Sequence, residues 1–175
     1  TSETADAVSR IVAEGRDRGY RGFLSVGGDG TANLVVNQLL GLQWPQPPTL
    51  GILPAGSGSD FIRTFGVPNQ LEAAADHLLT EDRYPVDVGC LSGVFGRRYF
   101  LNAANAGIGA RTVVEALRFP DWMGSRRYLA GFWSALARTS PDEIHVDCDG
   151  RTITTVGWNV VIANGQFFGG GMNVA

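Results

Sequence analysis

The most constraining feature of this sequence is a short apolar segment that ends in a glycine-rich turn holding one acid. Residues 23–26 read Phe-Leu-Ser-Val and residues 27–31 read Gly-Gly-Asp-Gly-Thr, after which apolar residues recur at helical spacing. A strand that ends in glycines before a helix leaves backbone N–H groups unpaired and lets a ligand approach the main chain. The pattern is typical of a phosphate-binding turn.

The acid in this turn, Asp29, adds a second requirement. A carboxylate repels phosphate unless a cation or a proton transfer is also involved, so Asp29 indicates Mg²⁺ and phosphoryl transfer. The alternative is a structural turn in which Asp29 only caps the following helix. Glycine and aspartate alone leave both interpretations open, and the choice depends on the rest of the chain.

A second glycine-bearing turn follows the next predicted strand. Residues 49–53 read Thr-Leu-Gly-Ile-Leu, which is typical of a buried strand, and residues 54–60 read Pro-Ala-Gly-Ser-Gly-Ser-Asp. Parallel α/β sheets bind their ligands at the carboxyl ends of the strands. We therefore expect the two turns to face one crevice, and their spacing favours ligand binding over a purely structural first turn.

The composition limits the classes of partner. A formal charge of −3 and a pI near 5.3 give no electrostatic footprint for nucleic acid, nor for strong attraction to an anionic membrane. No apolar run approaches the roughly 18 residues that span a bilayer, and no signal-peptide pattern opens the chain. Cys90 and Cys148 lie far apart without metal-like spacing, which indicates a reduced cytosolic setting. We expect a cytoplasmic protein with at most peripheral membrane contact.

The sequence changes in texture near its middle. Periodicity predicts helices at about residues 4–18, 31–40, 70–79, 110–117 and 124–137, and strands at 22–26, 49–53, 86–90, 99–103, 143–147, 152–155 and 158–163. We place a domain boundary near residues 83–85, with a Rossmann-like α/β domain over 1–84 and a mostly β domain over 85–175. A parallel sheet of two strands is too small to be buried on both faces. We therefore expect both domains to be incomplete, the first lacking its initial strands and the second truncated at its end.

Both turns and several later segments carry a resemblance to a known family. Besides residues 27–31 and 53–63, they are Asp-Val-Gly at 87–89, Phe-Leu-Asn at 100–102, Gly-Ile-Gly-Ala at 107–110 and Ala-Asn-Gly-Gln-Phe-Phe-Gly-Gly-Gly-Met at 163–172. Together they resemble the diacylglycerol kinase catalytic domain family, which includes bacterial lipid kinases, sphingosine kinases and ceramide kinases. The resemblance implies an α/β nucleotide-binding domain of the NAD kinase and diacylglycerol kinase type, followed by a β-sandwich-like domain.

The resemblance also implies an activity. Family members transfer the γ-phosphoryl group of ATP, with Mg²⁺, to a lipid hydroxyl. For this chain we expect diacylglycerol or another neutral lipid, because Arg111 occupies a position where sphingosine kinases have an acid suited to an amino group. The lipid would be reached at a membrane surface without a transmembrane segment, nucleic acid is not expected as a partner, and a homo-oligomer is left open.

The resemblance assigns roles to individual residues. Asp29 is the first candidate for the catalytic group, either as acceptor of the lipid hydroxyl proton or as a ligand of Mg²⁺ and its waters. The candidates for nucleotide binding are Gly27, Gly28, Gly30, Thr31 and Asn33 at the first turn, and Gly56, Ser57, Gly58 and Ser59 at the second. The supporting candidates are Asp60, Arg63 and Arg127. Their structural alternatives are a local ion pair between Asp60 and Arg63, a solvated Arg127, and a helix cap at Ser59 or Asp60.

Two departures from the family pattern keep other functions open. Leu34 stands where a glutamate usually follows the asparagine of the first motif, and Ser59 replaces the asparagine common before Asp60. These changes motivate a degenerate module that binds nucleotide or lipid without catalysis. The alternative enzyme is an NAD kinase-like protein, which shares the Gly-Gly-Asp-Gly turn.

Large apolar residues gather late in the chain. Leu129, Phe132, Trp133 and Leu136 recur at helical spacing, which is more typical of a buried helix face than of a lipid-facing surface. We therefore predict that these side chains pack in the core.

Overall fold

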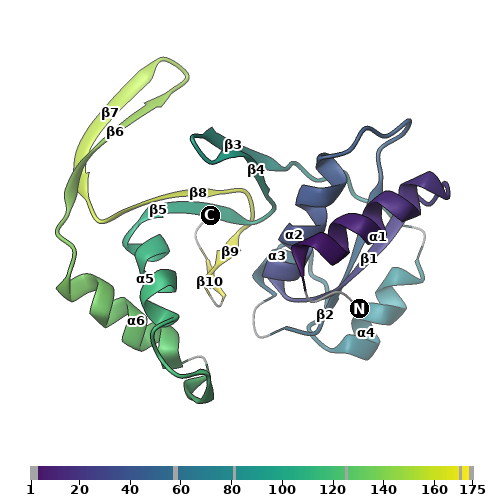
Figure 1. Ribbon diagram of the computed structural model, residues 1–175, viewed down its shortest axis with the longest axis horizontal. Coiled ribbons are helices and arrows are strands. Elements are labelled where there is room, and N and C mark those ends of the chain that lie inside the picture. Colours follow the sequence, from purple (N-terminus) through teal and green to yellow (C-terminus); the bar gives the residue numbers. More distant parts are fainter. Residues whose placement is uncertain (1–3, 57–58, 81, 125, 170, 174–175) are drawn as a thin grey trace. The chain divides into compact units, whose positions relative to one another are not determined.

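The computed structural model describes residues 4–56, 59–80, 82–124, 126–169 and 171–173. By its contacts the chain divides into two compact units, of which the first comprises residues 1–103 and 163–175 and the second residues 104–162 (Figure 1). This division differs from the boundary expected near residue 84, which stays a prediction about the family's domains. Within the described ranges, no helix is long and apolar enough to cross a membrane.

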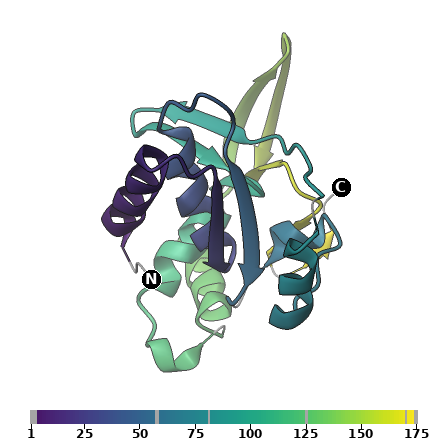
Figure 2. The ribbon, with the colours of Figure 1, turned by 90° about the vertical axis from the view of Figure 1, so that its right-hand side faces the viewer.

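The first unit is built on a parallel pair of strands. β1 (Gly22–Gly27) pairs with β2 (Thr49–Pro54), so both strands end at the same edge. α1 (Ala5–Asp17) precedes β1, and α2 (Asp29–Leu40) connects the two strands. Figure 2 shows α1 on one side of this pair and α4 (Leu71–Leu78) on the other. These elements confirm the α/β alternation predicted for the first part of the sequence.

Helix α2 is held on two sides, because its apolar residues face two separate clusters. One cluster contains Ala32, Val36, Phe61, Ile62 and Leu101, and the other contains Val35, Leu39, Val8 and Val12. None of these side chains is more than 9% exposed. Removing methylene groups from such sites leaves cavities that cost about 2–5 kcal/mol for a truncation to alanine. The burial therefore fixes the position of α2 and of the turn at its N-terminus.

The remaining elements of the first unit are short. They are α3 (Asp60–Arg63), β3 (Gly89–Gly93), β4 (Gly96–Phe100), β9 (Phe167–Phe168) and β10 (Met172–Asn173). β3 and β4 form an antiparallel hairpin, and so do β9 and β10. The strands predicted at 86–90 and 99–103 are misplaced, because the first hairpin begins at Gly89 and Leu101 leaves it to enter the core. Cys90 on β3 is a free, exposed thiol.

The second unit contains two pairs of strands. β5 (Ala103–Gly107) pairs with β8 (Asn159–Ala163), and β6 (Asp142–Cys148) pairs antiparallel with β7 (Arg151–Gly157). The turn between β6 and β7 has φ 51° at Asp149 and 76° at its glycine, the two positive values that a tight hairpin turn requires. The strands predicted at 143–147 and 152–155 are therefore confirmed, and the structure pairs them as a hairpin. Cys148 at the end of β6 is the second free, exposed thiol.

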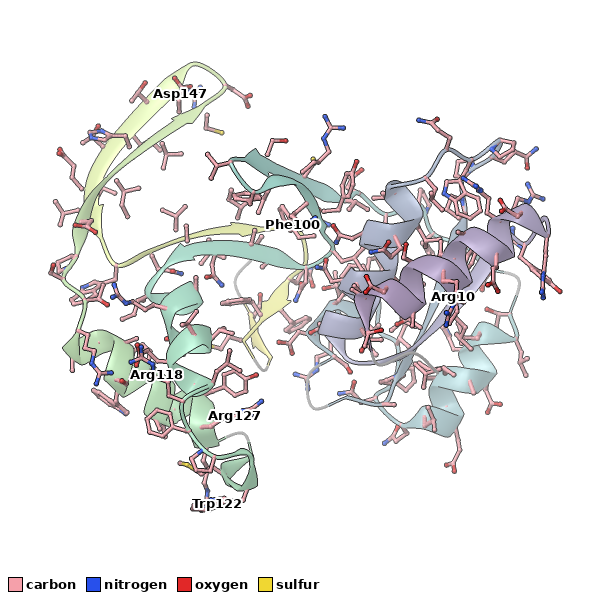
Figure 3. The ribbon with its side chains drawn as sticks, in the orientation of Figure 1. Arg10, Phe100, Arg118, Trp122, Arg127 and Asp147 are labelled. Atoms are coloured by element: carbon pink, nitrogen blue, oxygen red, sulfur yellow. The ribbon has the colours of Figure 1, made fainter. Side chains whose placement is uncertain are left out.

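Two helices and a short 3₁₀ segment complete the second unit. They are α5 (Ile108–Ala116), η1 (Asp121–Met123) and α6 (Arg126–Ala137). The two helices pack closely at Gly131, where a Cβ atom would lie 2.7 Å from the carbonyl oxygen of Thr112 on α5. Figure 3 labels Arg118, Trp122 and Arg127 on this helical hairpin.

The core packing predicted for α6 is wrong for three of the four side chains, and the fourth, Leu136, is half-buried. Leu129 is 62% exposed, Trp133 is 61% exposed and Phe132 is 38% exposed. The side of α6 that contacts α5 is formed instead by small residues, of which Gly131 and Ala135 are buried. Helical spacing detected the apolar stripe, but it does not determine which side of a helix meets its neighbour.

A buried carboxylate on α5 links the two helices by hydrogen bonds. Glu115 is 4% exposed, and its Oε2 accepts hydrogen bonds from the hydroxyl of Ser134 at 2.8 Å and from Arg138 at 2.7 Å. Arg118 donates to the same oxygen at 3.1 Å. The Ser134 hydrogen bond and the arginine charges hold the pKa of the Glu115 carboxyl below its ordinary value, although burial acts in the opposite direction. The carboxyl therefore stays ionised between the two helices.

This pKa shift predicts a pH dependence of stability. Because the folded pKa of Glu115 lies below the unfolded one, its contribution is complete above the unfolded pKa and is lost as the pH falls through the folded pKa. We expect Glu115→Gln to lower the melting temperature at pH 7, and to lose less stability than the unchanged chain below about pH 5. Thermal unfolding measures both, with Glu14→Gln at an exposed site of α1 as the control. Identical acid sensitivity of Glu115→Gln and the unchanged chain would contradict the assignment.

Candidate functional site

The first predicted turn lies where β1 ends and α2 begins. The carbonyl oxygen of Gly28 accepts the N–H groups of Thr31 at 3.0 Å and Ala32 at 3.1 Å, which starts the helix. At Gly27 a Cβ atom would collide with the side chain of Thr31. Part of the glycine requirement in this turn is therefore set by packing within the turn itself.

The second predicted turn touches the first. The N–H of Ala55 donates to the carbonyl oxygen of Gly27 at 3.1 Å, as the strands end side by side. A Cβ atom on Gly56 would lie 2.6 Å from the Cα atom of Gly28 and would overlap the backbone there. The two glycine turns are thus in backbone contact, as expected from the carboxyl ends of neighbouring parallel strands. Ser57 and Gly58, two of the predicted nucleotide-binding residues, lie outside the described residues.

Asp29 joins the two turns through its side chain. Its Oδ2 accepts the backbone N–H of Asp60 at 2.9 Å, and its Oδ1 accepts the backbone N–H of Phe61 at 3.1 Å. These N–H groups open helix α3, where no intrahelical acceptor is available for them. Asp29 therefore caps a helix, but it is α3 and not α2, the helix to which the residue itself belongs. Each carboxylate oxygen keeps a further lone pair for another donor or a metal ion.

The residues that begin α3 have other roles than the predicted cap. Ser59 occupies the N-cap position and is 7% exposed, yet its side chain makes no capping hydrogen bond. Asp60 is buried and lies 3.6 Å from Nη1 of Arg63, so the local ion pair considered as the structural alternative is present. A Cβ atom on Gly171, which has φ 99°, would collide with the same guanidinium. Arg63 also borders a cavity of about 160 Å³ with Pro54, Gly56, Ser59 and Asn69.

Two candidates on α2 differ from their neighbours. Among the residues that the structure describes, a Cβ atom at Gly30 would meet nothing within 4 Å, and the backbone φ of Gly30 is not positive. The fold around it therefore tolerates a side chain. Asn33 buries its Oδ1 without a hydrogen-bond partner among the residues that the structure describes. Gly30 therefore leaves space beside the main chain, and Asn33 leaves a hydrogen-bond acceptor that no described residue uses.

The sequence analysis did not identify Asn37, which links α2 to β4. Its Nδ2 donates to the carbonyl oxygen of Tyr99 at 2.8 Å, and its Oδ1 accepts the N–H of Tyr99 at 2.9 Å. The amide thus satisfies both backbone groups of one residue on the hairpin. Asparagine is an unfavourable residue in a helix interior. Its presence at position 37, next to the apolar Val36, was therefore a sequence indication that the side chain makes a tertiary hydrogen bond.

Arg127 lies apart from these residues in the chain. It belongs to α6 in the second unit, where its guanidinium carbon lies 5.4 Å from the ring centroid of Tyr128. Its expected place near the phosphates stays a prediction. Within the described ranges, no group of three or more His, Cys, Asp or Glu side chains could hold a metal ion. Asp29 and Asp60 bring two carboxyl-bearing residues to the paired turns.

The backbone contact between the turns predicts a specific loss of stability. Gly56→Ala should lower the free energy of unfolding by about 1–3 kcal/mol, because the added methyl group forces the backbones of the two turns apart. Gly30→Ala is the matched control and should leave stability unchanged or raise it, since alanine favours the helix. Chemical denaturation measures both variants. Equal stability of the two variants would show that the turns do not depend on this contact.

The family assignment comes from comparison with known proteins. The model of the diacylglycerol kinase catalytic domain matches residues 1–91, and that of the YegS C-terminal NAD kinase β sandwich-like domain matches residues 102–175. Diacylglycerol kinase of Bacillus subtilis is 32% identical over 131 residues, which is 74% of this chain and 41% of that protein. Lipid kinase YegS of Escherichia coli K12 is 29% identical over 175 residues, which is 99% of this chain and 57% of that protein.

Solved structures agree with this result. A crystal structure of a diacylglycerol kinase from Bacillus anthracis has a TM-score of 0.69 and 27% identity, and the alignment covers 97% of this chain and 51% of that one. The chain therefore spans about half the length of the proteins it matches. Its fold is the α/β catalytic domain followed by the β sandwich-like domain expected from the sequence. The chain belongs to the diacylglycerol kinase catalytic domain family.

Proposed function

We propose that this chain is part of a lipid kinase that transfers the γ-phosphoryl group of ATP, with Mg²⁺, to the hydroxyl of diacylglycerol or a related neutral lipid. The observation that carries the proposal is the pair of glycine turns at the carboxyl ends of β1 and β2, joined by the carboxylate of Asp29. Relatives named lipid kinase YegS and diacylglycerol kinase support the same class of reaction. The lipid would be met at a membrane surface by a cytoplasmic protein.

The nucleotide phosphates would approach the first turn from the side of Gly30. A ligand can come close to the main chain there, because no side chain of the described part of the chain occupies the space beside this residue. The N-terminus of α2, a helix of 12 residues, adds a favourable dipole for negative charge. Thr31 and Asn33 follow on the same helix and are proposed as polar contacts. Gly27 and Gly56 would contribute through the shape of the paired turns.

Asp29 is proposed as the acid closest to the chemistry. Mg²⁺ commonly binds through one or two carboxylates together with waters and substrate phosphates, so a cage of three acids is not needed. The free lone pairs of Asp29 fit that pattern, and Asp60 follows at the start of α3. When bound, the metal ion would neutralise negative charge on the nucleotide phosphates. The protein's contribution is to hold the carboxylates and turns in fixed positions.

The choice of a neutral lipid depends on one charge in the second unit. Arg111 lies on α5 with an exposed side chain, and the acid near it, Glu115, is already hydrogen-bonded to Ser134 and two arginines. A cation of this kind repels the amino group of a sphingoid base. We therefore favour an acceptor that carries a hydroxyl and no amine.

A lipid-phosphorylation screen tests the proposal. The full-length protein would be incubated with radiolabelled ATP and Mg²⁺ and with micelles of diacylglycerol, ceramide or sphingosine, and separately with NAD. We expect label in diacylglycerol and much less in sphingosine. Label in NAD alone would support the NAD kinase-like alternative. Binding of Mg·ATP without transfer to any acceptor would instead indicate a non-catalytic module, as Leu34 and Ser59 suggested.

Asp29→Asn tests the role of the acid. The amide keeps the size of the side chain but removes its charge and one of the two acceptor oxygens that hold α3. We expect turnover to fall by about 10²–10⁴-fold, the usual range for losing a group that acts on a proton or charge in the transition state. Steady-state kinetics with a melting curve measures the effect. A variant with near-normal kcat would refute a catalytic or metal-binding role.

Gly30→Ala tests the direction from which the phosphates approach. Because the fold accepts a methyl group at this position, loss of binding would come from the ligand and not from unfolding. We expect at least a tenfold weaker affinity for Mg·ATP, about 1.4 kcal/mol, with no fall in melting temperature. Isothermal titration calorimetry measures the affinity. Unchanged affinity would mean that the phosphates lie elsewhere on the paired turns.

A further inference from the structure

Three segments that carry the family resemblance take no part in the glycine turns, yet they meet at one place in the first unit. They are residues 87–89, 100–102 and 163–167, and they are joined by the side chains of Asn102 and Asn164. We call these two side chains and the backbone groups they bind the asparagine clasp. The clasp lies among described residues throughout.

Asn164 binds two strand ends at once. Its Nδ2 donates to the carbonyl oxygen of Asp87 at 2.7 Å and to that of Leu101 at 2.7 Å. Its own backbone N–H donates to the carbonyl oxygen of Asn102 at 2.7 Å, and the next N–H, from Gly165, donates to the same oxygen at 3.0 Å. One residue therefore ties the segment entering β3 to the segment leaving β4.

Asn102 completes the clasp from the opposite side. Its Nδ2 donates to the carbonyl oxygen of Phe167 at 2.9 Å, at the start of β9. A Cβ atom on Gly165 would collide with Oδ1 of Asn102, so the two chain segments approach as closely as glycine allows. The amide groups of both asparagines are consequently fixed in orientation by the backbone around them.

The clasp reaches the helix that begins at the second glycine turn. The N–H of Gln166 donates to Oγ1 of Thr64 at 3.1 Å, and Thr64 is the C-cap residue of α3. Leu101 packs in the same buried cluster as Phe61, inside α3. Helix α3 is therefore held at its N-terminus by Asp29 and at its C-terminus by Gln166, two residues after Asn164 of the clasp.

The clasp also lies where the chain passes between the units. The chain leaves the first unit after residue 103 and returns before residue 163, so Asn102 and Asn164 each adjoin one crossing. We propose that Asn102 and Asn164 are positioning residues for phosphoryl transfer. They hold together the two chain segments that connect the units and, through Gln166, the C-terminus of α3. This inference rests on the proposed kinase function.

Phosphoryl transfer explains why such an element matters. The reaction depends almost wholly on the relative positions of donor, metal ion and acceptor, and a misplacement of about 1 Å can cost about 10²-fold in rate. Because the first glycine turn is also fixed by the pairing of β1 with β2 and by the packing of α2 against α1, both outside the clasp, loosening the clasp should leave nucleotide affinity nearly intact. The rate of transfer should fall instead. A residue needed only for folding would not separate these two quantities.

The test uses Asn164→Ala and Asn102→Asp in the full-length protein. Asn164→Ala removes two side-chain hydrogen bonds, and the isosteric Asn102→Asp removes the donor to Phe167. Asn159→Ala is the matched control, because it removes one side-chain hydrogen bond, to Gly109, inside the second unit. At saturating ATP and lipid we expect kcat to fall at least tenfold in both clasp variants, with the dissociation constant for Mg·ATP changed less than threefold. The control should keep its kcat within twofold.

Two outcomes would overturn the proposal. If the clasp variants melt at lower temperature but the folded protein keeps a normal kcat, the clasp is a structural feature only. If the affinity for Mg·ATP falls in parallel with kcat, the clasp supports nucleotide binding and not transfer. Both outcomes are read from the same calorimetric and kinetic measurements.

Hydrogen exchange keeps the clasp testable if no lipid is phosphorylated. Asn164→Ala should speed exchange of the amides of Asp60 and Phe61 relative to the unchanged protein, since it loosens the segment whose Gln166 N–H binds Thr64 at the opposite end of α3. Asn159→Ala should not. Unchanged exchange at these amides would overturn the coupling, whereas absence of lipid phosphorylation with faster exchange would contradict only the proposed function.

Discussion

The capping of α3 by Asp29 is the interaction on which the rest of the first unit depends. A helix of four residues is too short to be stable by itself, so its position must be set by contacts from elsewhere. Asp29 lies 31 residues before the first N–H that it accepts, and it belongs to the turn that ends the neighbouring strand. The carboxylate of Asp29 therefore fixes α3 to the two turns, which the pairing of β1 with β2 already brings together. Helix α2, buried on two sides, holds that carboxylate in place.

The glycines of the paired turns are needed for different physical reasons. Gly27 and Gly56 are small because other parts of the protein occupy the space where a side chain would be. Gly30 has an ordinary backbone conformation and no described residue beside the place of a Cβ atom, so the described packing does not explain the glycine. The same residue type thus serves packing at two positions, and at the third it is proposed to leave access for a ligand. If the motif is interpreted only as a phosphate-binding sequence, the glycines needed for packing are not distinguished from the one proposed to face the ligand.

Much of the fold could be predicted from the sequence, because α1, α2 and the parallel strands have clear periodicity and turn signals. Helix α3 and the β9–β10 hairpin could not, since two to four residues carry no period. The sequence placed Asp29 in the site, but its partners at residues 60 and 61 depend on how the two strands pair. The prediction that Trp133 is buried was wrong for a related reason. Helical spacing shows that a stripe is apolar, whereas the close contact of α6 with α5 is made at the small residue Gly131.

The two cysteines give the chain one reporter thiol in each unit. Cys90 lies on β3 in the first unit and Cys148 on β6 in the second, and both are free and exposed. This sequence contains two cysteines in all, so spectroscopic labels would attach to it at known places without any substitution. Each label would sit on a strand of an antiparallel hairpin. A label-to-label distance recorded with and without nucleotide would therefore report movement of one unit against the other in the unaltered sequence.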